Sequence, residues 1–197
     1  MIIPVIVLTA VAAGPVDDAK ELGKALEYFT AGKYHECLII LSRLDKHYRL
    51  NPRYRAYLAT CYYYDWDYPN AVKVFEEVEP AFQNLAPHER SFYYWAWGES
   101  LFALQRWKEA IPKYEAMLPV CYPSEQAETY YRLGYCHLML KAWDKAHECF
   151  LLAQKGYEQF PQLKNRKARL AQLRNMIRGC EERGIKQKIE GKFGQSK

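Results

Sequence analysis

Residues 130–161 of the 197-residue chain read YYRLGYCHLMLKAWDKAHECFLLAQKGYEQFP. Apolar and aromatic residues recur here at the spacing of a helix face, which predicts two amphipathic helices. Small residues stand at Gly134 and, twelve positions later, at Ala146; Phe150 follows after four more, and Pro161 ends the stretch. Because small residues let two helix backbones approach, this order predicts a closely packed helix pair.

The same pattern occurs four times along the chain. We call the small residue of the first helix the anchor position, and its separations of 34, 39 and 36 residues place it at Ala25, Ala59, Gly98 and Gly134. Twelve residues after each anchor comes a crossing position, occupied by Cys37, Ala71, Ala110 and Ala146. Four residues further comes a filling position, occupied by Leu41, Phe75, Tyr114 and Phe150. A constant offset in four copies indicates an internal repeat.

This pattern resembles the tetratricopeptide repeat (TPR), whose signature is W-x2-L-G-x2-Y, then A-x3-F, then P, with a period of about 34 residues. Tyr130 takes the Trp position, His137 takes the Tyr position, and Leu133-Gly134 match the signature directly. The resemblance covers roughly residues 18–160. It implies an all-α fold: a right-handed superhelical solenoid of about four helix-turn-helix repeats plus a C-terminal capping helix.

Composition divides the chain into three segments. Residues 1–16 begin with the apolar run MIIPVIVLTAVAAG, residues 17–183 hold the repeats and a predicted capping helix at 162–183, and residues 184–197 are expected to form a basic flexible tail. Residues 162–197 carry eleven Lys or Arg against three Glu. A solvated outer face of the capping helix explains this charge without a nucleic-acid partner, so we do not expect one.

The apolar run at 2–13 is too short to span a bilayer and resembles the core of a secretory signal, although it lacks a positively charged start. We interpret it as a signal remnant, which favours an exported or envelope-associated protein. Two alternatives remain open: an apolar strap packed on the first repeat or in its groove, and a cytoplasmic location. Membrane contact is expected only through this segment or the basic tail.

No catalytic or metal-binding motif occurs in the sequence. The six cysteines form no C-x2-C pair, and no phosphate-binding glycine loop or serine elbow is present. We therefore expect no enzyme, no metal site and no cofactor. The cysteines are interpreted as small buried hydrophobic residues.

The resemblance also implies where a ligand would bind, because TPR arrays line a concave groove with the first helix of each repeat. By register, groove positions include Leu22, Leu26, Phe29, Arg53, Thr60, Glu128 and Met139. The main candidates for peptide binding are Tyr63, Tyr64, Phe92, Trp95, Glu99, Phe102, Tyr131 and Tyr135. Tyr and Trp offer large contact areas at low entropic cost, which suits a peptide. Alternatively, these aromatic side chains pack on one another.

We therefore predict a non-catalytic scaffold that binds a protein or peptide through an aromatic concave groove. The groove lacks the Lys, Asn and Arg clamp with which some TPR proteins bind acidic C-terminal tails, and Arg132 is the nearest basic residue. The alternative function is a self-associating structural module, a homo-oligomer whose groove is filled by residues 1–14 or by another copy.

Overall fold

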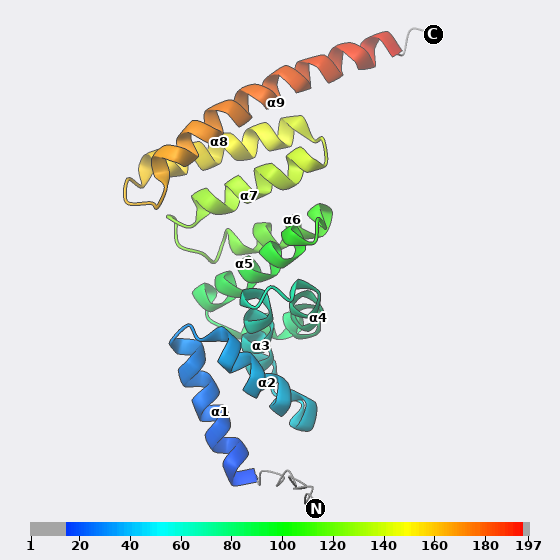
Figure 1. Ribbon diagram of the computed structural model, residues 1–197. Helices are drawn as coiled ribbons and strands as arrows, with labels where there is room; N and C mark the ends of the chain where they lie inside the picture. Colours follow the sequence, from blue (N-terminus) through cyan, green and yellow to red (C-terminus); the bar gives the residue numbers. More distant parts are fainter. Residues whose placement is uncertain (1–14, 195–197) are drawn as a thin grey trace, which may run out of the picture.

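The computed structural model describes residues 15–194, with side chains from 17 to 186, and this part of the chain contains helices and no strand. Figure 1 shows the helices stacked in chain order, with α1 at one end and α9 at the other. The elements are α1 (Pro15–Thr30), α2 (Tyr34–Tyr48), α3 (Pro52–Tyr64), α4 (Tyr68–Val78), a 3-10 helix η1 (Glu79–Asn84), α5 (Pro87–Ala103), α6 (Trp107–Met117), α7 (Gln126–Met139), α8 (Trp143–Gln159) and α9 (Arg166–Gly194).

The predicted fold class is confirmed. Helices α1/α2, α3/α4, α5/α6 and α7/α8 form four antiparallel pairs that stack into a superhelical solenoid, and α9 packs on α8 at the C-terminal end. No repeat can bury its own apolar face alone, so each pair is stabilised by its neighbours and the last pair by α9.

The residues that define the repeat are those that pack the helix pairs. Every crossing and filling position is completely buried, from Cys37 and Leu41 in the first repeat to Ala146 and Phe150 in the fourth. A Cβ atom added to Gly98 would lie 2.7 Å from the Tyr114 ring, and one added to Gly134 would overlap the Phe150 ring. In the last two repeats, the aromatic filling residue thus occupies the space that the glycine leaves empty.

The turn inside each repeat uses a left-handed backbone conformation seven residues after the anchor. Gly32 has φ +71°, and the equivalent positions at Trp66, Gln105 and Lys141 have φ between 59° and 61°. In each turn, two successive backbone N–H groups donate to carbonyls near the end of the first helix, as in Gly32 N to Phe29 O at 3.0 Å and Lys33 N to Tyr28 O at 2.8 Å. These bonds satisfy C-terminal carbonyls that the helix itself leaves open.

Helix boundaries agree with the sequence in some places and differ in others. Asn51 caps α3 as predicted, since its side chain accepts the Tyr54 N–H at 3.1 Å. The predicted capping helix at 162–183 instead begins at Arg166, and α9 continues to Gly194 through the segment expected to be flexible. The stretch contains Gly184 but no Pro, and the helix continues past this glycine although the core pattern ends earlier. The apolar segment at 1–14 lies outside the described residues.

Between residues 15 and 194, no helix combines the length and apolar character that crossing a membrane requires.

A first test of the packing account replaces Gly134 with Ala. The added methyl group overlaps Phe150, so we expect a loss of about 1–3 kcal/mol in the free energy of unfolding, measured by urea denaturation. Gly179→Ala is the matched control, because a Cβ atom there meets nothing within 4 Å. Relief of glycine entropy in a helix should make that variant more stable by about 0.5–1 kcal/mol. Equal effects of the two substitutions would contradict the account.

A second test concerns the left-handed turns. Lys141→Gly removes a side chain from a position with φ 59°, so the melting temperature should rise by a few degrees, corresponding to about 0.5–1 kcal/mol. Gly32→Ala should lower stability by about 1 kcal/mol, although its Cβ meets no atom within 4 Å, because the cost lies in the backbone alone. Both values follow from thermal melts; a stabilising Gly32→Ala would be inconsistent with the turn geometry.

Candidate functional pocket between α5 and α7

The candidate site lies where the third and fourth repeats meet. Helix α6 packs against both α5 and α7, and the loop 118–125 leads from the end of α6 into α7. This loop is part of the extra spacing between the last two anchors. It leaves an opening beside the N-terminal halves of α5 and α7.

This opening is a cavity of about 350 Å³, which we call the α5/α7 pocket. Its volume falls within the range typical of ligand-binding pockets. Its walls come from three helices and two loops: His88, Ser91, Phe92, Trp95, Met117, Ser124, Glu125, Glu128 and Leu163. The lining is largely apolar, with a few polar groups that converge on it.

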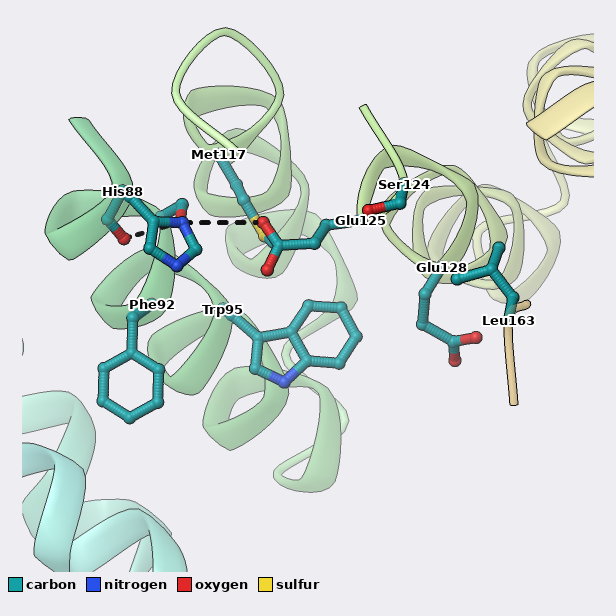
Figure 2. A pocket seen from close by; sticks show the side chains of 9 residues that line it. His88, Phe92, Trp95, Met117, Ser124, Glu125, Glu128 and Leu163 are labelled. Carbon is teal, nitrogen blue, oxygen red and sulfur yellow. Dashed lines mark hydrogen bonds and ion pairs between the residues drawn. The ribbon is translucent and has the colours of Figure 1, made fainter. Parts of the chain in front are cut away.

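Two aromatic side chains of α5 form one wall. Phe92 and Trp95 are both partly buried and both line the pocket, and in Figure 2 the Glu125 carboxylate lies above Trp95. The Trp95 ring packs edge-on against Tyr114, with 5.9 Å between centroids. Tyr114 is a filling residue and is completely buried, so the repeat core holds Trp95 in place.

Glu125 is positioned by the turn that precedes α7. Its Oε2 atom accepts the backbone N–H of Tyr122 at 2.9 Å, while its own backbone N–H donates to the Tyr122 carbonyl at 2.9 Å. The same oxygen lies 3.8 Å from Nδ1 of His88, beyond the length of a hydrogen bond. No donor among the described residues reaches the Oε1 atom.

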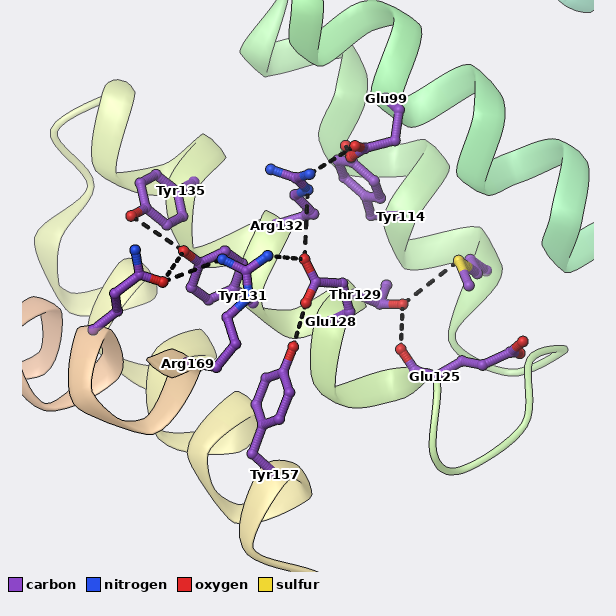
Figure 3. A network of polar contacts seen from close by, with 12 residues as sticks. Glu99, Tyr114, Glu125, Glu128, Thr129, Tyr131, Arg132, Tyr135, Tyr157 and Arg169 are labelled. Carbon is purple, nitrogen blue, oxygen red and sulfur yellow. Dashed lines mark hydrogen bonds and ion pairs between the residues drawn. The ribbon is translucent and has the colours of Figure 1, made fainter. Parts of the chain in front are cut away.

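Glu128, one turn further along α7, belongs to a network that ties α7 to α8 and α9 (Figure 3). Its carboxylate accepts from Nη2 of Arg169 at 2.8 Å and from the hydroxyl of Tyr157. Arg169 also lies over the Tyr131 ring, 4.0 Å from its centroid. Glu128 therefore borders the pocket with its charge already balanced by Arg169.

A second ion pair joins α5 to α7 beyond the pocket. Nη2 of Arg132 donates to Glu99 at 2.8 Å, and the Tyr114 hydroxyl donates to the other Glu99 oxygen at 2.5 Å. Burial raises the pKa of Glu99 above its ordinary value, and Arg132 and Tyr114 oppose that rise. The pair fixes the distance between α5 and α7 and so supports the pocket wall.

The structure brings only two of the eight main candidates into this pocket, Phe92 and Trp95. Glu99 is largely buried in the ion pair, and Phe102 packs edge-on against Trp107, 4.8 Å between centroids. Tyr63 lies beside Tyr64, which stacks on Tyr34 of α2 at 3.9 Å.

Tyr131 is buried beneath Arg169 of α9, although the TPR register placed it in the groove. Burial raises its pKa to about 12. Tyr135 packs against both Tyr131 and Phe150. Helix α9 covers this side of α7 at the end of the array, since Arg169 and Gln172 both contact Tyr131.

Aromatic side chains also pack against one another across the first three repeats. Phe29 of α1 lies 4.4 Å from Tyr57 of α3 and 6.3 Å from Phe92 of α5, measured between ring centroids. This corresponds to the alternative in which groove aromatics pack on one another. Here α1 and α5 are in contact across α3.

Several pocket residues lie outside the candidate set: His88, Ser91, Met117, Ser124, Glu125 and Leu163. They come from the first two turns of α5, the end of α6, and the loops before α7 and α9. The TPR register assigns groove positions at fixed places in the first helix of each repeat, and none of these six residues stands at such a position. The lengthened spacing before Gly134 is the sequence signal that marks this joint.

No group of three His, Cys, Asp or Glu side chains suited to a metal ion occurs in the described part of the chain, and its six cysteines are free thiols.

The fold is similar to those of solved TPR-like proteins. MamA from Desulfovibrio magneticus RS-1 superposes with a TM-score of 0.57 at 20% identity, covering 89% of this chain and 99% of that chain. MamA AMB-1 gives a TM-score of 0.61 at 14% identity, covering 86% of this chain and 92% of that chain. The apo form of RapI gives 0.64 at 11% identity, covering 88% of this chain and 66% of RapI.

No protein-family model matches the chain, and no curated protein is significantly similar in sequence. At 20% identity or less, the structural similarity concerns the fold. Together with the four packed helix pairs, it defines the class of the molecule: an all-α, TPR-like repeat solenoid.

The α5–α7 ion pair leads to a test by Arg132→Met. This change removes the charge that balances Glu99 and keeps much of the aliphatic stem, so near pH 7 we expect a loss of roughly 2–4 kcal/mol in unfolding free energy. Because burial raises the pKa of Glu99, the folded state binds its proton more tightly than the unfolded state does. Stability contributed by protonated Glu99 is therefore lost as pH rises from its ordinary pKa of 4.5 through the folded value.

The deficit of Arg132→Met should consequently shrink at about pH 5, where more Glu99 is protonated, in urea denaturation at both pH values. Adding Glu99→Gln should restore most of the lost stability near neutral pH. A deficit that stays constant with pH and survives Glu99→Gln would assign the loss to packing of the Arg132 stem instead.

Proposed function

We propose that this protein is a non-catalytic scaffold that binds a protein or peptide partner, and that the α5/α7 pocket receives an anchoring side chain of that partner. The observation that carries the proposal is the pocket itself, a cavity of about 350 Å³ with Phe92 and Trp95 in its wall. Large aromatic side chains in concave sites supply much of the energy in protein recognition.

The TPR-like fold supports the general function, since such solenoids present extended surfaces to protein partners. The pocket adds a specific place on that surface. Its wall is fixed by the repeat core behind Trp95 and by the Glu99–Arg132 ion pair, so a partner would meet a preformed site. Preorganisation lowers the entropic cost of binding.

The proposal is tested with random peptides displayed on phage and selected on the immobilised full chain. Selected peptides should bind the wild-type protein, and Trp95→Ala should weaken binding at least about tenfold, because about 1.4 kcal/mol or more of aromatic contact is lost. Trp66→Ala is the matched control, since Trp66 is 77% exposed in the α3–α4 turn, outside the pocket. It should bind like the wild type.

Circular dichroism of each variant separates binding from folding. If Trp95→Ala loses helix content, Ser124→Leu provides a second route, because it fills the pocket from the loop before α7. The proposal is wrong if no peptide is selected, or if the selected peptides bind folded Trp95→Ala and Ser124→Leu variants as tightly as the wild type.

A further inference from the structure

We infer that the α5/α7 pocket takes a basic side chain, Lys or Arg, from an extended segment of the partner. This inference rests on the proposed function and specifies its ligand chemistry. It follows from the charges that reach the pocket and from the two aromatic rings in its wall.

Four of the charged side chains around the pocket form two ion pairs. Glu99 and Glu128 are acidic, and each is paired at 2.8 Å with a basic residue, Arg132 and Arg169 respectively. These four side chains cancel one another. Glu125 adds a fifth charge; the pocket lining contains no Lys or Arg, and Nδ1 of its one histidine, His88, lies 3.8 Å from Oε2 of Glu125. The net charge contributed by these carboxylates and guanidinium groups is therefore negative.

The Glu125 carboxylate has one oxygen available to a ligand. Oε2 of Glu125 accepts the Tyr122 backbone N–H at 2.9 Å and lies 3.8 Å from Nδ1 of His88, whereas no donor in the described part of the chain makes a hydrogen bond to Oε1. The carboxylate lines the pocket beside Trp95 (Figure 2). Seating an apolar group here would remove water from a carboxylate without supplying a donor, which is costly. A phosphate or carboxylate ligand would be repelled.

The aromatic wall of the pocket also suits a cation. A cation placed over the face of Trp or Phe is attracted by the ring quadrupole, most strongly by Trp. Two arginines nearby already use this interaction: Arg132 lies 5.0 Å from the Phe102 centroid and 5.9 Å from the Trp95 centroid, and Arg169 lies over Tyr131. Glu99 neutralises Arg132, which leaves Glu125 to pair with an incoming cation.

The size of the pocket suits a single side chain. The apolar part of the lining, which includes Met117 and Leu163, suits the methylene stem of a Lys or Arg side chain, whose charged end would then reach Glu125. A pocket of about 350 Å³ accommodates a side chain rather than a folded element. A basic residue presented by an extended peptide therefore satisfies the volume, the apolar wall and the charge together.

The experiment uses the peptides selected on the full chain. The selected sequences should share a Lys or Arg, and replacing that residue with norleucine should weaken binding at least about tenfold in fluorescence polarisation titrations. Exchanging Lys for Arg in the same peptide shows which of the two cations the pocket binds more tightly. Glu125→Gln should weaken binding of the basic peptide by a similar factor and leave the norleucine peptide unaffected. Glu148→Gln, an exposed charge change on α8, is the matched control.

Failure of this inference can be distinguished from failure of the proposed function. Peptides that need Trp95 but contain no basic residue, or that tolerate both norleucine and Glu125→Gln, would overturn the basic-ligand inference and leave the scaffold function standing. Peptides that bind independently of Trp95 would refute both. Both peptides are titrated against both the wild-type protein and Glu125→Gln. If the losses in binding free energy caused by norleucine and by Glu125→Gln simply add, the inference is also overturned, because two groups in contact should show coupled losses.

Discussion

The close approach of two helices within each repeat is the constraint on which the rest of the structure depends. A small anchor residue on the first helix lets the second helix come near, and a large filling residue then occupies the remaining space. In the fourth repeat, Gly134 leaves room for the Phe150 ring, and both Ala146 and Phe150 are completely buried. A left-handed residue seven positions after the anchor returns the chain for the second helix. Repetition of this unit produces the solenoid.

The pocket arises where this regular unit is interrupted. The joint between α5 and α7 includes the loop 118–125, and the two helices are connected by the Glu99–Arg132 ion pair rather than by aromatic packing like that of Phe29, Tyr57 and Phe92. The N-terminal halves of α5 and α7 consequently enclose a cavity. The same network of charged and tyrosine side chains holds α9 against α7 and α8 through Arg169.

The sequence predicted the fold well because the repeat residues report directly on local packing. Anchor and crossing positions are identifiable by size and spacing, and their burial in the structure agrees with the prediction. The site was predicted only in part. Phe92 and Trp95 lie on groove positions, but Glu125 and Leu163 come from loops whose path depends on tertiary contacts. Tyr131 occupies a groove position by register, yet its exposure depends on where α9 docks, and the repeat pattern contains no information about that.

The most direct test of the account is a crystal structure of the full chain with a selected peptide. The account predicts that a Lys or Arg side chain of the peptide lies in the α5/α7 pocket, over the Trp95 ring and within hydrogen-bond distance of Glu125. A peptide bound on another face, with the α5/α7 pocket empty, would contradict it.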